Sequence, residues 1–439
     1  MKNTNQSLLR YKGVSYVLPF VLITLCFALW GFANDITNPM VKAFSKIFRM
    51  SVTDGTLVQV AFYGGYFAMA FPAAMFIRRF SYKAGILLGL GLYAVGAFLF
   101  FPAKLTGEFY PFLVAYFILT CGLSFLETSA NPYILSMGSE ETATRRLNLA
   151  QSFNPMGSLL GMYVAMNFIQ ARLDPMDTAQ RSNLGEAEFA AMRDSDLSVL
   201  ITPYILIGLV IVAMFLIIRF YPMPKSQDKN RDINFLPTLR RIFGLRRYRE
   251  GVLAQFFYVG AQIMVWTFII QYGTRIFMEQ GMGEKAAEVL SQKYNIAAMI
   301  IFCTSRFICT FLLKYLNAGK LLMILSVAAC CFTAGTIAID GMAGLYCLVG
   351  ISACMSLMFP TIYGIALEGL GDDAKFGAAG LIMAILGGSV LPPLQARIID
   401  METIGGFPAV NISFVLPFIC FVVVAVYGFR TFKTKKLCK

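Results

Sequence analysis

The sequence predicts an all-α membrane protein with twelve transmembrane helices, and three observations carry this prediction. Of the 439 residues, 58% are hydrophobic and only 14% are charged, whereas soluble domains carry about 25% charged residues. The mean hydropathy of the chain is +0.67. Apolar runs of about 20 residues, long enough to cross a bilayer as a helix, recur from one end of the chain to the other.

The apolar runs form two sets of six, separated by a basic stretch. The first set lies near 17–40, 57–77, 84–102, 110–137, 146–170 and 198–220, and the second near 251–274, 294–315, 320–340, 343–367, 376–396 and 408–430. We therefore expect an N-terminal six-helix bundle over 1–220, a cytoplasmic basic linker over 221–249 and a C-terminal six-helix bundle over 250–439, as in many transporters. In the outer loop 171–197 we expect a short amphipathic helix around Glu186–Met192.

Basic residues set the expected orientation of these helices. With the N-terminus inside, the inner segments hold 24 of the 37 lysines and arginines and the outer segments hold 11. This asymmetry predicts that both termini lie in the cytoplasm. The net charge of +13 comes mainly from short loops between apolar runs. A bilayer therefore explains it better than a nucleic-acid partner does.

The residues that metal sites and most enzymes need are missing from the sequence. The chain has ten cysteines without a CxxC pair, and it has no histidine, so we expect reduced core cysteines and no metal site. It contains no GxxxxGK[ST] phosphate loop, no HExxH motif and no GxSxG elbow. We therefore expect that the protein is not an enzyme and that it needs no cofactor. If protons move through this chain, carboxyl groups must carry them.

Glu127 is the most informative single residue. It lies in the otherwise uncharged run 112–137, roughly 22 Å from one end and 15 Å from the other along a helix. A carboxylate near the membrane midplane is costly, which indicates a proton or substrate site in a polar cavity. Ser124, Thr128 and Asn131 share its helix face. A polar stripe for helix–helix hydrogen bonding is the alternative.

A second carboxyl group occurs in the first run. Asn34, Asp35 and Asn38 lie on one helix face, and Asp35 lies roughly 27 Å along the helix from Val17. Its carboxyl group is either a helix-end charge near the outer headgroups or a second titrating group that faces the same cavity as Glu127.

Amides and aromatic rings follow these acids on other helices. An amide both donates and accepts hydrogen bonds, as a sugar hydroxyl does, so these side chains suit a polyhydroxylated ligand. Interhelical hydrogen bonding and ordinary packing are the alternatives. The candidates are Asn148, Gln151, Asn154 and Ser158 in the fifth run, Gln255, Tyr258, Gln262 and Trp266 in the seventh, and Trp30 in the first.

Arg306 is the one cation well inside a run, in the segment FCTSRFICTF. A buried arginine in a membrane helix pairs with a carboxylate or lines a cavity. A purely structural salt bridge is an equal alternative.

Several motifs resemble the fucose–galactose–glucose:proton symporter family of the major facilitator superfamily, along nearly the whole chain. They are FALWGFAND (27–35), AFYGGYFAMAFPA (61–73), RRFSYKAG (78–85), FLETSANP (125–132), RRLNLAQSFNPMG (145–157), VLAQFFYVGAQ (252–262) and FPTIYGIAL (359–367). LETSANP and LNLAQSFN are the most specific of them.

The resemblance implies proton-coupled import of a hexose or deoxyhexose by alternating access. The family's fourth-helix acid falls on Glu127, and its fifth-helix amides fall on Gln151 and Asn154. The first-helix acid usually stands where this chain has Asn38, and here the acid is Asp35 instead. The carboxyl group thus moves about 4.5 Å along the helix axis.

We therefore expect a symporter in a bacterial cytoplasmic membrane, with L-fucose as the first substrate and galactose, glucose or an N-acetylhexosamine next. A family tyrosine is matched by Phe359, which lacks the hydroxyl group. A proton gradient would drive a monomer in which Glu127 and Asp35 couple protons. A sodium-coupled or uniporting carrier and a non-transporting sugar sensor are the rival readings. The residues expected to contact the sugar are Asn38, Asn131, Gln151, Asn154, Gln262, Trp30 and Trp266, with Arg306 as a possible cavity cation.

Overall fold

The computed structural model describes residues 8–11, 14–37, 40–50, 54, 57–174, 176, 181, 183–224, 235–399, 401 and 403–437. They pack as two compact units, and neither unit is one continuous stretch of chain. The glutamate unit comprises Tyr16–Tyr133 and Phe153–Ile233, and the arginine unit comprises Met1–Ser15, Ile134–Ser152 and Asn234–Lys439. The division into halves 1–220 and 250–439 remains a prediction about the sequence.

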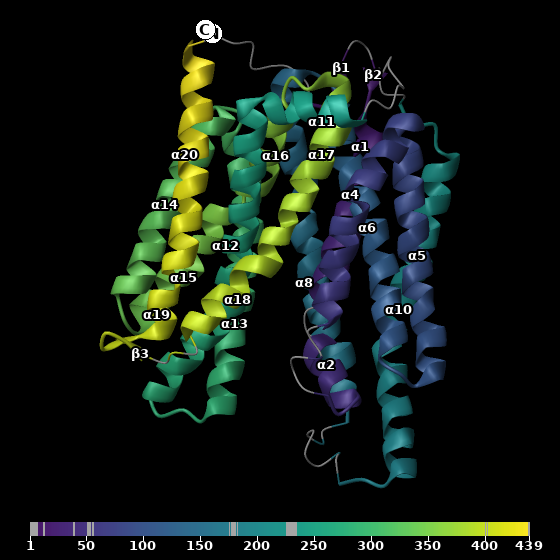
Figure 1. Ribbon diagram of the computed structural model, residues 1–439, viewed down its shortest axis with the longest axis vertical. Helices are drawn as coiled ribbons and strands as arrows, with labels where there is room; N and C mark the ends of the chain where they lie inside the picture. The colour runs from purple at the N-terminus through teal and green to yellow at the C-terminus, as the bar shows by residue number, and fades with distance from the viewer. Residues whose placement is uncertain are drawn as a thin grey trace. The chain divides into compact units, whose positions relative to one another are not determined.

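The glutamate unit is built from long apolar helices (Figure 1). They are α1 (Val17–Thr37), α2 (Met40–Ile47), α4 (Leu57–Arg79), α5 (Tyr82–Thr106), most of α6 (Tyr110–Ser136), α8 (Asn154–Val164) and α10 (Glu186–Phe220). Helix α10 begins at Glu186 and runs without a break for 35 residues. The short helix expected around Glu186–Met192 is therefore the first part of a membrane-length helix.

Close backbone contact holds α1 against α8. A Cβ atom on Gly31 would lie 2.0 Å from the carbonyl oxygen of Asn154, and one on Gly157 would lie 1.8 Å from that of Ala28. Only glycine allows helices to approach this closely, as is common in membranes. Ser158 Oγ donates to the Gly31 carbonyl across the same contact, at 3.3 Å.

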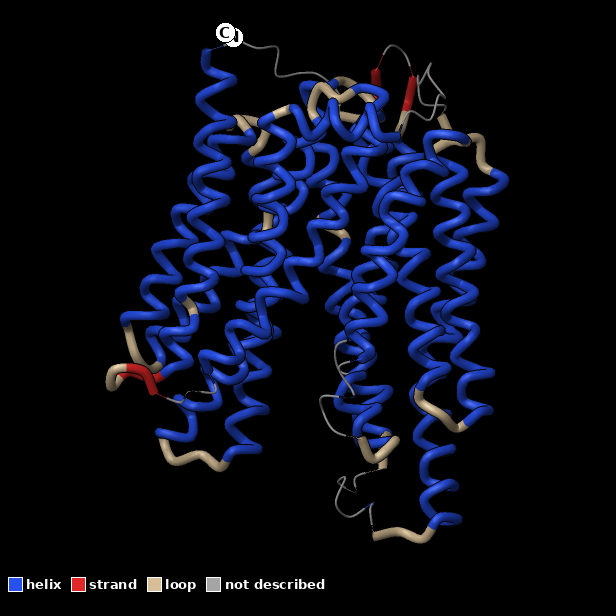
Figure 2. The backbone as a smooth tube through the Cα atoms, viewed as in Figure 1, coloured by secondary structure: helices blue, strands red, loops and turns tan. Residues whose placement is uncertain are grey.

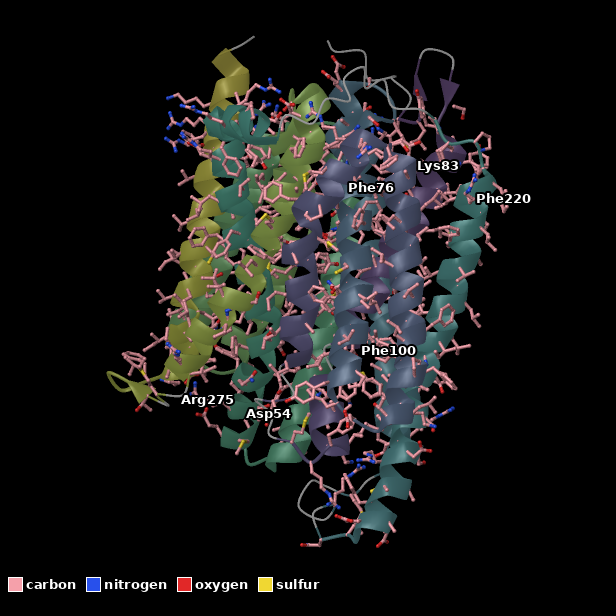
Figure 3. All side chains as sticks on the ribbon, turned by 45° about the vertical axis from the view of Figure 1, so that its right-hand side comes forward. Asp54, Phe76, Lys83, Phe100, Phe220 and Arg275 are labelled. Atoms are coloured by element: carbon pink, nitrogen blue, oxygen red, sulfur yellow. The ribbon has the colours of Figure 1, made fainter. Side chains whose placement is uncertain are left out.

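Aromatic and polar contacts join α5, α6 and α10. The rings of Phe100 and Tyr204 stack at 4.1 Å, and the Tyr204 hydroxyl is 2.7 Å from that of Tyr116. Where α5 begins and α10 ends, Lys83 Nζ donates to the Arg219 carbonyl at 3.1 Å. Figure 3 shows Lys83 and Phe220 close together there. A lysine at a helix C-terminus satisfies carbonyls that have no partner within the helix.

The arginine unit contains a further set of helices, among which α14 and α20 lie side by side (Figure 1). The helices are α7 (Ala143–Gln151), α11 (Phe235–Gly244), α12 (Arg246–Glu279), α13 (Glu284–Leu312), α14 (Ala318–Ala338), α15 (Met342–Met355), α16 (Met358–Leu367), α17 (Ala374–Met383), α18 (Gly387–Ile399), α19 (Ala409–Ser413) and α20 (Val415–Leu437). Single 3-10 turns occur at Glu140–Thr142, Gly371–Asp373 and Ala384–Leu386.

The strands in the described part of the chain are short and peripheral (Figure 2). Strands β1 (Arg10–Tyr11) and β2 (Val14–Ser15) form one antiparallel pair. Strands β3 (Thr403–Ile404) and β4 (Phe407–Pro408) form another. The all-α expectation is confirmed, because each strand has only two residues.

Eleven helices among the described residues are long and apolar enough to cross a membrane. The twelfth expected span, 146–170, is divided into α7, α8, a π-helical segment η2 (Ala165–Ile169) and a 3-10 turn η3 (Gln170–Arg172). Pro155 explains the first division, since its ring removes the N–H that would bond to the carbonyl four residues earlier. The backbone stays right-handed through Ser152 (φ −66°, ψ −18°) and Phe153 (φ −84°, ψ −16°). The fifth crossing is thus a kinked helix rather than two helices joined by a loop.

Candidate functional site

Glu127 is buried within the glutamate unit on α6. Its side chain is only 3% exposed. Its Oε2 atom has no hydrogen-bond partner, and the ion pairs among the described residues do not include it. Burying an ionised carboxylate without a cation is costly, and binding a proton removes that cost. The geometry suits a group that gains and loses a proton.

The other members of the polar face on α6 differ in how they are used. Asn131 Nδ2 donates to the Glu127 backbone carbonyl at 3.1 Å, and Ser124 Oγ donates to the Tyr66 carbonyl of α4 at 3.2 Å. Thr128 Oγ1 is buried and has no hydrogen-bond partner within the described residues. Two of the four side chains, those of the sequence neighbours Glu127 and Thr128, thus have a buried oxygen without a hydrogen bond among the described residues.

Asp35 lies on α1, two residues before the helix ends at Thr37, and is half-buried. It lies within electrostatic range of Tyr63, while Glu127 lies within range of Tyr66. The two tyrosines are three residues apart on α4 and therefore share a face. The two acids thus lie near different tyrosines on one face of α4. Asn38, where the resemblance placed the first-helix acid, lies outside the described residues.

The sequence did not single out Tyr63 and Tyr66. Both lie in the motif AFYGGYFAMAFPA, and the i, i+3 spacing of two tyrosines around a glycine pair was the available signal. Tyr66 is buried and Tyr63 is half-buried, and the ring centroid of Phe62 lies 5.7 Å from that of each tyrosine.

Trp30 and Asn154 complete the glutamate unit's share of the expected site. Trp30 is buried and stacks on Phe27 with ring centroids 4.9 Å apart. Asn154 Nδ2 donates to the Phe27 carbonyl at 3.2 Å. One N–H of this amide therefore already holds α8 to α1, and its second N–H and its oxygen are left for a ligand.

The remaining candidates belong to the arginine unit. Trp266 Nε1 donates to Ser352 Oγ at 3.3 Å, and its ring meets Phe302 edge-on at 4.9 Å. Gln262 lies one turn earlier on α12, is half-buried and forms no side-chain hydrogen bond within the described residues. The amide of Gln262 and the ring of Trp266 thus occupy one helix face.

Gln151 and Arg306 meet in the same unit. Gln151 is the last residue of α7 and is 4% exposed, and its backbone carbonyl accepts a hydrogen bond from Arg306 Nη1 at 2.9 Å. Arg306 Nε donates to the Ser356 carbonyl, and the guanidinium lies 4.6 Å from the Phe302 ring centre. The expected carboxylate partner does not occur among the described ion pairs. Arg306 binds backbone carbonyls instead.

The cysteines agree only in part with the expectation of core residues, because six are buried, Cys330 and Cys347 are half-buried and Cys331 is exposed. All nine that the structure describes are free, and Cys438 lies outside the described residues.

Comparison with known proteins identifies the family. Residues 23–393 match the model of the Major Facilitator Superfamily. The chain is 53% identical to the L-fucose-proton symporter of Haemophilus influenzae, covering 96% of this chain and 98% of that protein. It is 32% identical to the L-fucose-proton symporter of Escherichia coli, covering 98% of both.

The fold agrees with these relatives. A crystal structure of the Major Facilitator Superfamily transporter FucP in the outward conformation superimposes with a TM-score of 0.85 at 31% identity, covering 95% of this chain and 99% of that one. The chain belongs to the Major Facilitator Superfamily. It is a multi-pass membrane transporter rather than an enzyme, as the sequence predicts. The glucose/galactose transporter of Brucella abortus is 29% identical over 94% of both chains.

Proposed function

We propose that this chain is a proton-coupled symporter that imports L-fucose, with Glu127 as the coupling carboxyl group. The observation that carries the proposal is a buried carboxyl group without a cation in the middle of a membrane helix. The L-fucose-proton symporters of Haemophilus influenzae and Escherichia coli, which match nearly its full length, support the substrate and the coupling ion.

In the proposed mechanism, protonation of Glu127 neutralises the carboxyl group and allows it to donate a hydrogen bond to a sugar hydroxyl. Asp35 acts as the second titrating group. The loaded carrier then opens to the cytoplasm, where both acids release their protons. The side chains that contact the sugar are Asn38, Asn131, Gln151, Asn154, Gln262, Trp30 and Trp266.

We further propose that the carrier is a monomer in the bacterial inner membrane with both termini in the cytoplasm. The excess of lysine and arginine in the inner segments supports this orientation. Proteolysis of a C-terminal tag in right-side-out and inverted vesicles tests it. Cleavage in right-side-out vesicles would contradict the cytoplasmic C-terminus.

The experiment that tests the function measures proton movement when sugar is added to de-energised cells that express the protein. L-fucose should make the medium alkaline, because the sugar enters together with protons. The panel includes D-galactose, D-glucose and N-acetylglucosamine, and the relatives named as glucose/galactose transporters make the first two the main competitors.

Proton movement, together with uptake and counterflow of labelled sugar, separates the rival functions. Uptake of L-fucose without alkalinisation, and dependent on sodium, would indicate a sodium-coupled carrier. Binding without counterflow of labelled sugar would indicate a sensor. Alkalinisation by galactose or glucose but not by L-fucose would move the chain to the other substrate group.

A further inference from the structure

Arg306 lies in the arginine unit beside the C-terminal ends of α7 and α15, where two helix kinks begin. Its side chain is 3% exposed and forms no ion pair among the described residues. Nη1 binds the Gln151 carbonyl at the end of α7, and Nε binds the Ser356 carbonyl just after α15. One guanidinium thus joins two kinked helices.

Both carbonyls lack their usual helical partner for the same reason. Pro155 follows Gln151 by four residues, and Pro360 follows Ser356 by four. Proline has no N–H, so neither carbonyl can accept the regular i+4 hydrogen bond. The backbone nevertheless stays right-handed at Ser356 (φ −53°, ψ −36°), as it does at the first kink. Each proline therefore leaves one carbonyl without a hydrogen bond from its own helix, and Arg306 donates to both carbonyls.

The two kinked helices are also neighbours in an antiparallel arrangement. A Cβ atom on Gly364 of α16 would lie 2.9 Å from Thr144 Oγ1 of α7. Further along, Asn148 Nδ2 of α7 donates to Thr361 Oγ1 of α16 at 3.2 Å. The sequence rises along α7 and falls along α16, so the kinks come together at one end of this contact, where Arg306 lies.

The kink between α15 and α16 is held from α12 as well. Tyr258 OH donates to the Met355 carbonyl at 3.0 Å. Ser356 Oγ donates to Ser305 Oγ of α13 at 3.1 Å, beside Arg306. Phe359, the residue at the family's tyrosine position, follows directly and lies 6.4 Å from the Tyr258 ring.

We propose that Arg306 is a positioning residue for the sugar site. By donating hydrogen bonds to both carbonyls that lack a helical partner, it fixes Gln151 and Phe359 relative to each other. Its guanidinium is a clamp rather than a ligand for a carboxylate. This inference rests on the proposed function, since it assigns Gln151 and Phe359 to the sugar.

An arginine is required because the two acceptors belong to different helices. A guanidinium offers five donors in a fixed plane, whereas a lysine ammonium is a compact point charge on a flexible stem. Arg306→Lys should therefore hold only one of the two carbonyls. The half-saturating L-fucose concentration of Arg306→Lys should lie between those of the native protein and of Arg306→Met, which holds neither carbonyl.

The test combines Arg306→Met with Pro155→Ala and Pro360→Ala. Alanine restores the N–H groups, so each helix can satisfy its own carbonyl and the clamp is no longer needed. In the native background, Arg306→Met should raise the half-saturating L-fucose concentration at least about tenfold, because two buried acceptors lose their donor. In the double-alanine background the same substitution should raise it less than about threefold. Alkalinisation at saturating sugar should persist in both.

Thermal unfolding in detergent without sugar separates this inference from the proposed function. It is measured on four proteins: the native protein and the double-alanine variant, each with and without Arg306→Met. Arg306→Met should lower the midpoint more in the proline background than in the alanine background. Equal losses in both backgrounds, or unchanged sugar affinity in Arg306→Met, would overturn the clamp. Failure of the native protein to respond to L-fucose would overturn the proposed function, while the unfolding cycle would still decide whether Arg306 closes the kinks. If Arg306→Met does not fold, Arg306→Lys replaces it in both backgrounds.

Discussion

Glu127 and Arg306 are both charged residues deep inside membrane helices, and the structure treats them in opposite ways. Glu127 keeps a carboxyl oxygen without a hydrogen-bond partner among the described residues. Arg306 donates to two carbonyls and lies over an aromatic ring. Glu127 Oε2 has no hydrogen bond to break when the carboxyl group gains or releases a proton, whereas Arg306 loses contacts when it moves. The comparison predicts that Glu127 couples transport and that Arg306 organises the structure.

The largest effect should come from removing the open group. Glu127→Gln keeps the shape of the side chain but cannot lose a proton, so accumulation driven by a pH gradient should stop. A gradient of one pH unit supports about tenfold accumulation per proton, and the variant should remain at the external concentration. Uptake of labelled L-fucose into proteoliposomes measures this.

Glu141→Gln is the matched control, because Glu141 is exposed outside the spanning helices. It should accumulate sugar like the native protein. Exchange of labelled for unlabelled sugar should survive in Glu127→Gln, which shows that the variant is folded. Uphill uptake by Glu127→Gln would contradict the coupling role.

Much of this comparison could be predicted from the sequence. Glu127 is visible because an acid in an apolar run is rare and costly. The long helices follow from apolar length, and the kink near Gln151 follows from Pro155. The partners of Arg306 could not be predicted, since backbone carbonyls have no sequence signature and Gln151 is 155 residues away. The role of Asn154 was likewise hidden, because its partner is a carbonyl of α1.

A second, smaller effect tests whether the first-helix acid has exchanged places with an amide. Asp35→Asn should slow pH-driven uptake by about tenfold, as expected for loss of a hydrogen bond to a charged group. Adding Asn38→Asp should restore part of the uptake, because the acid returns to the position usual in the family. Uptake rates of the single and double variants, normalised to protein in the membrane, measure this. Absence of rescue would mean that the two positions are not interchangeable.

Phe359→Tyr should have a moderate effect that is confined to sugar recognition. The new hydroxyl lies beside the kink held by Arg306 and offers the sugar one more hydrogen bond, worth about 0.5–1.5 kcal/mol. The half-saturating concentration of at least one sugar in the panel should change about threefold to tenfold, while alkalinisation per sugar stays the same. A changed coupling ratio would place Phe359 in the proton pathway instead.

The smallest effect should come from an ordinary ion pair at the membrane surface, which serves as the reference for both buried charges. Arg275 Nη2 pairs with Asp340 Oδ2 at 3.0 Å, and the Asp340 side chain is 57% exposed. Partial burial raises the pKa of Asp340, but hydrogen bonds from Arg275 and the Gly341 N–H outweigh it, so the pKa lies below its usual value. A lowered pKa contributes stability above the unfolded-state value of about 3.9 and loses it as the pH falls further.

Because the pair is solvent-exposed, Asp340→Asn should cost less than about 1 kcal/mol. Its unfolding midpoint should lie slightly below that of the native protein at pH 7, and the difference should shrink toward pH 3. If Asp340→Asn lowered the unfolding midpoint as much as Arg306→Met does, the stabilising effect of an arginine in this protein would come from its charge alone. It would not come from hydrogen bonds to the carbonyls at two kinks.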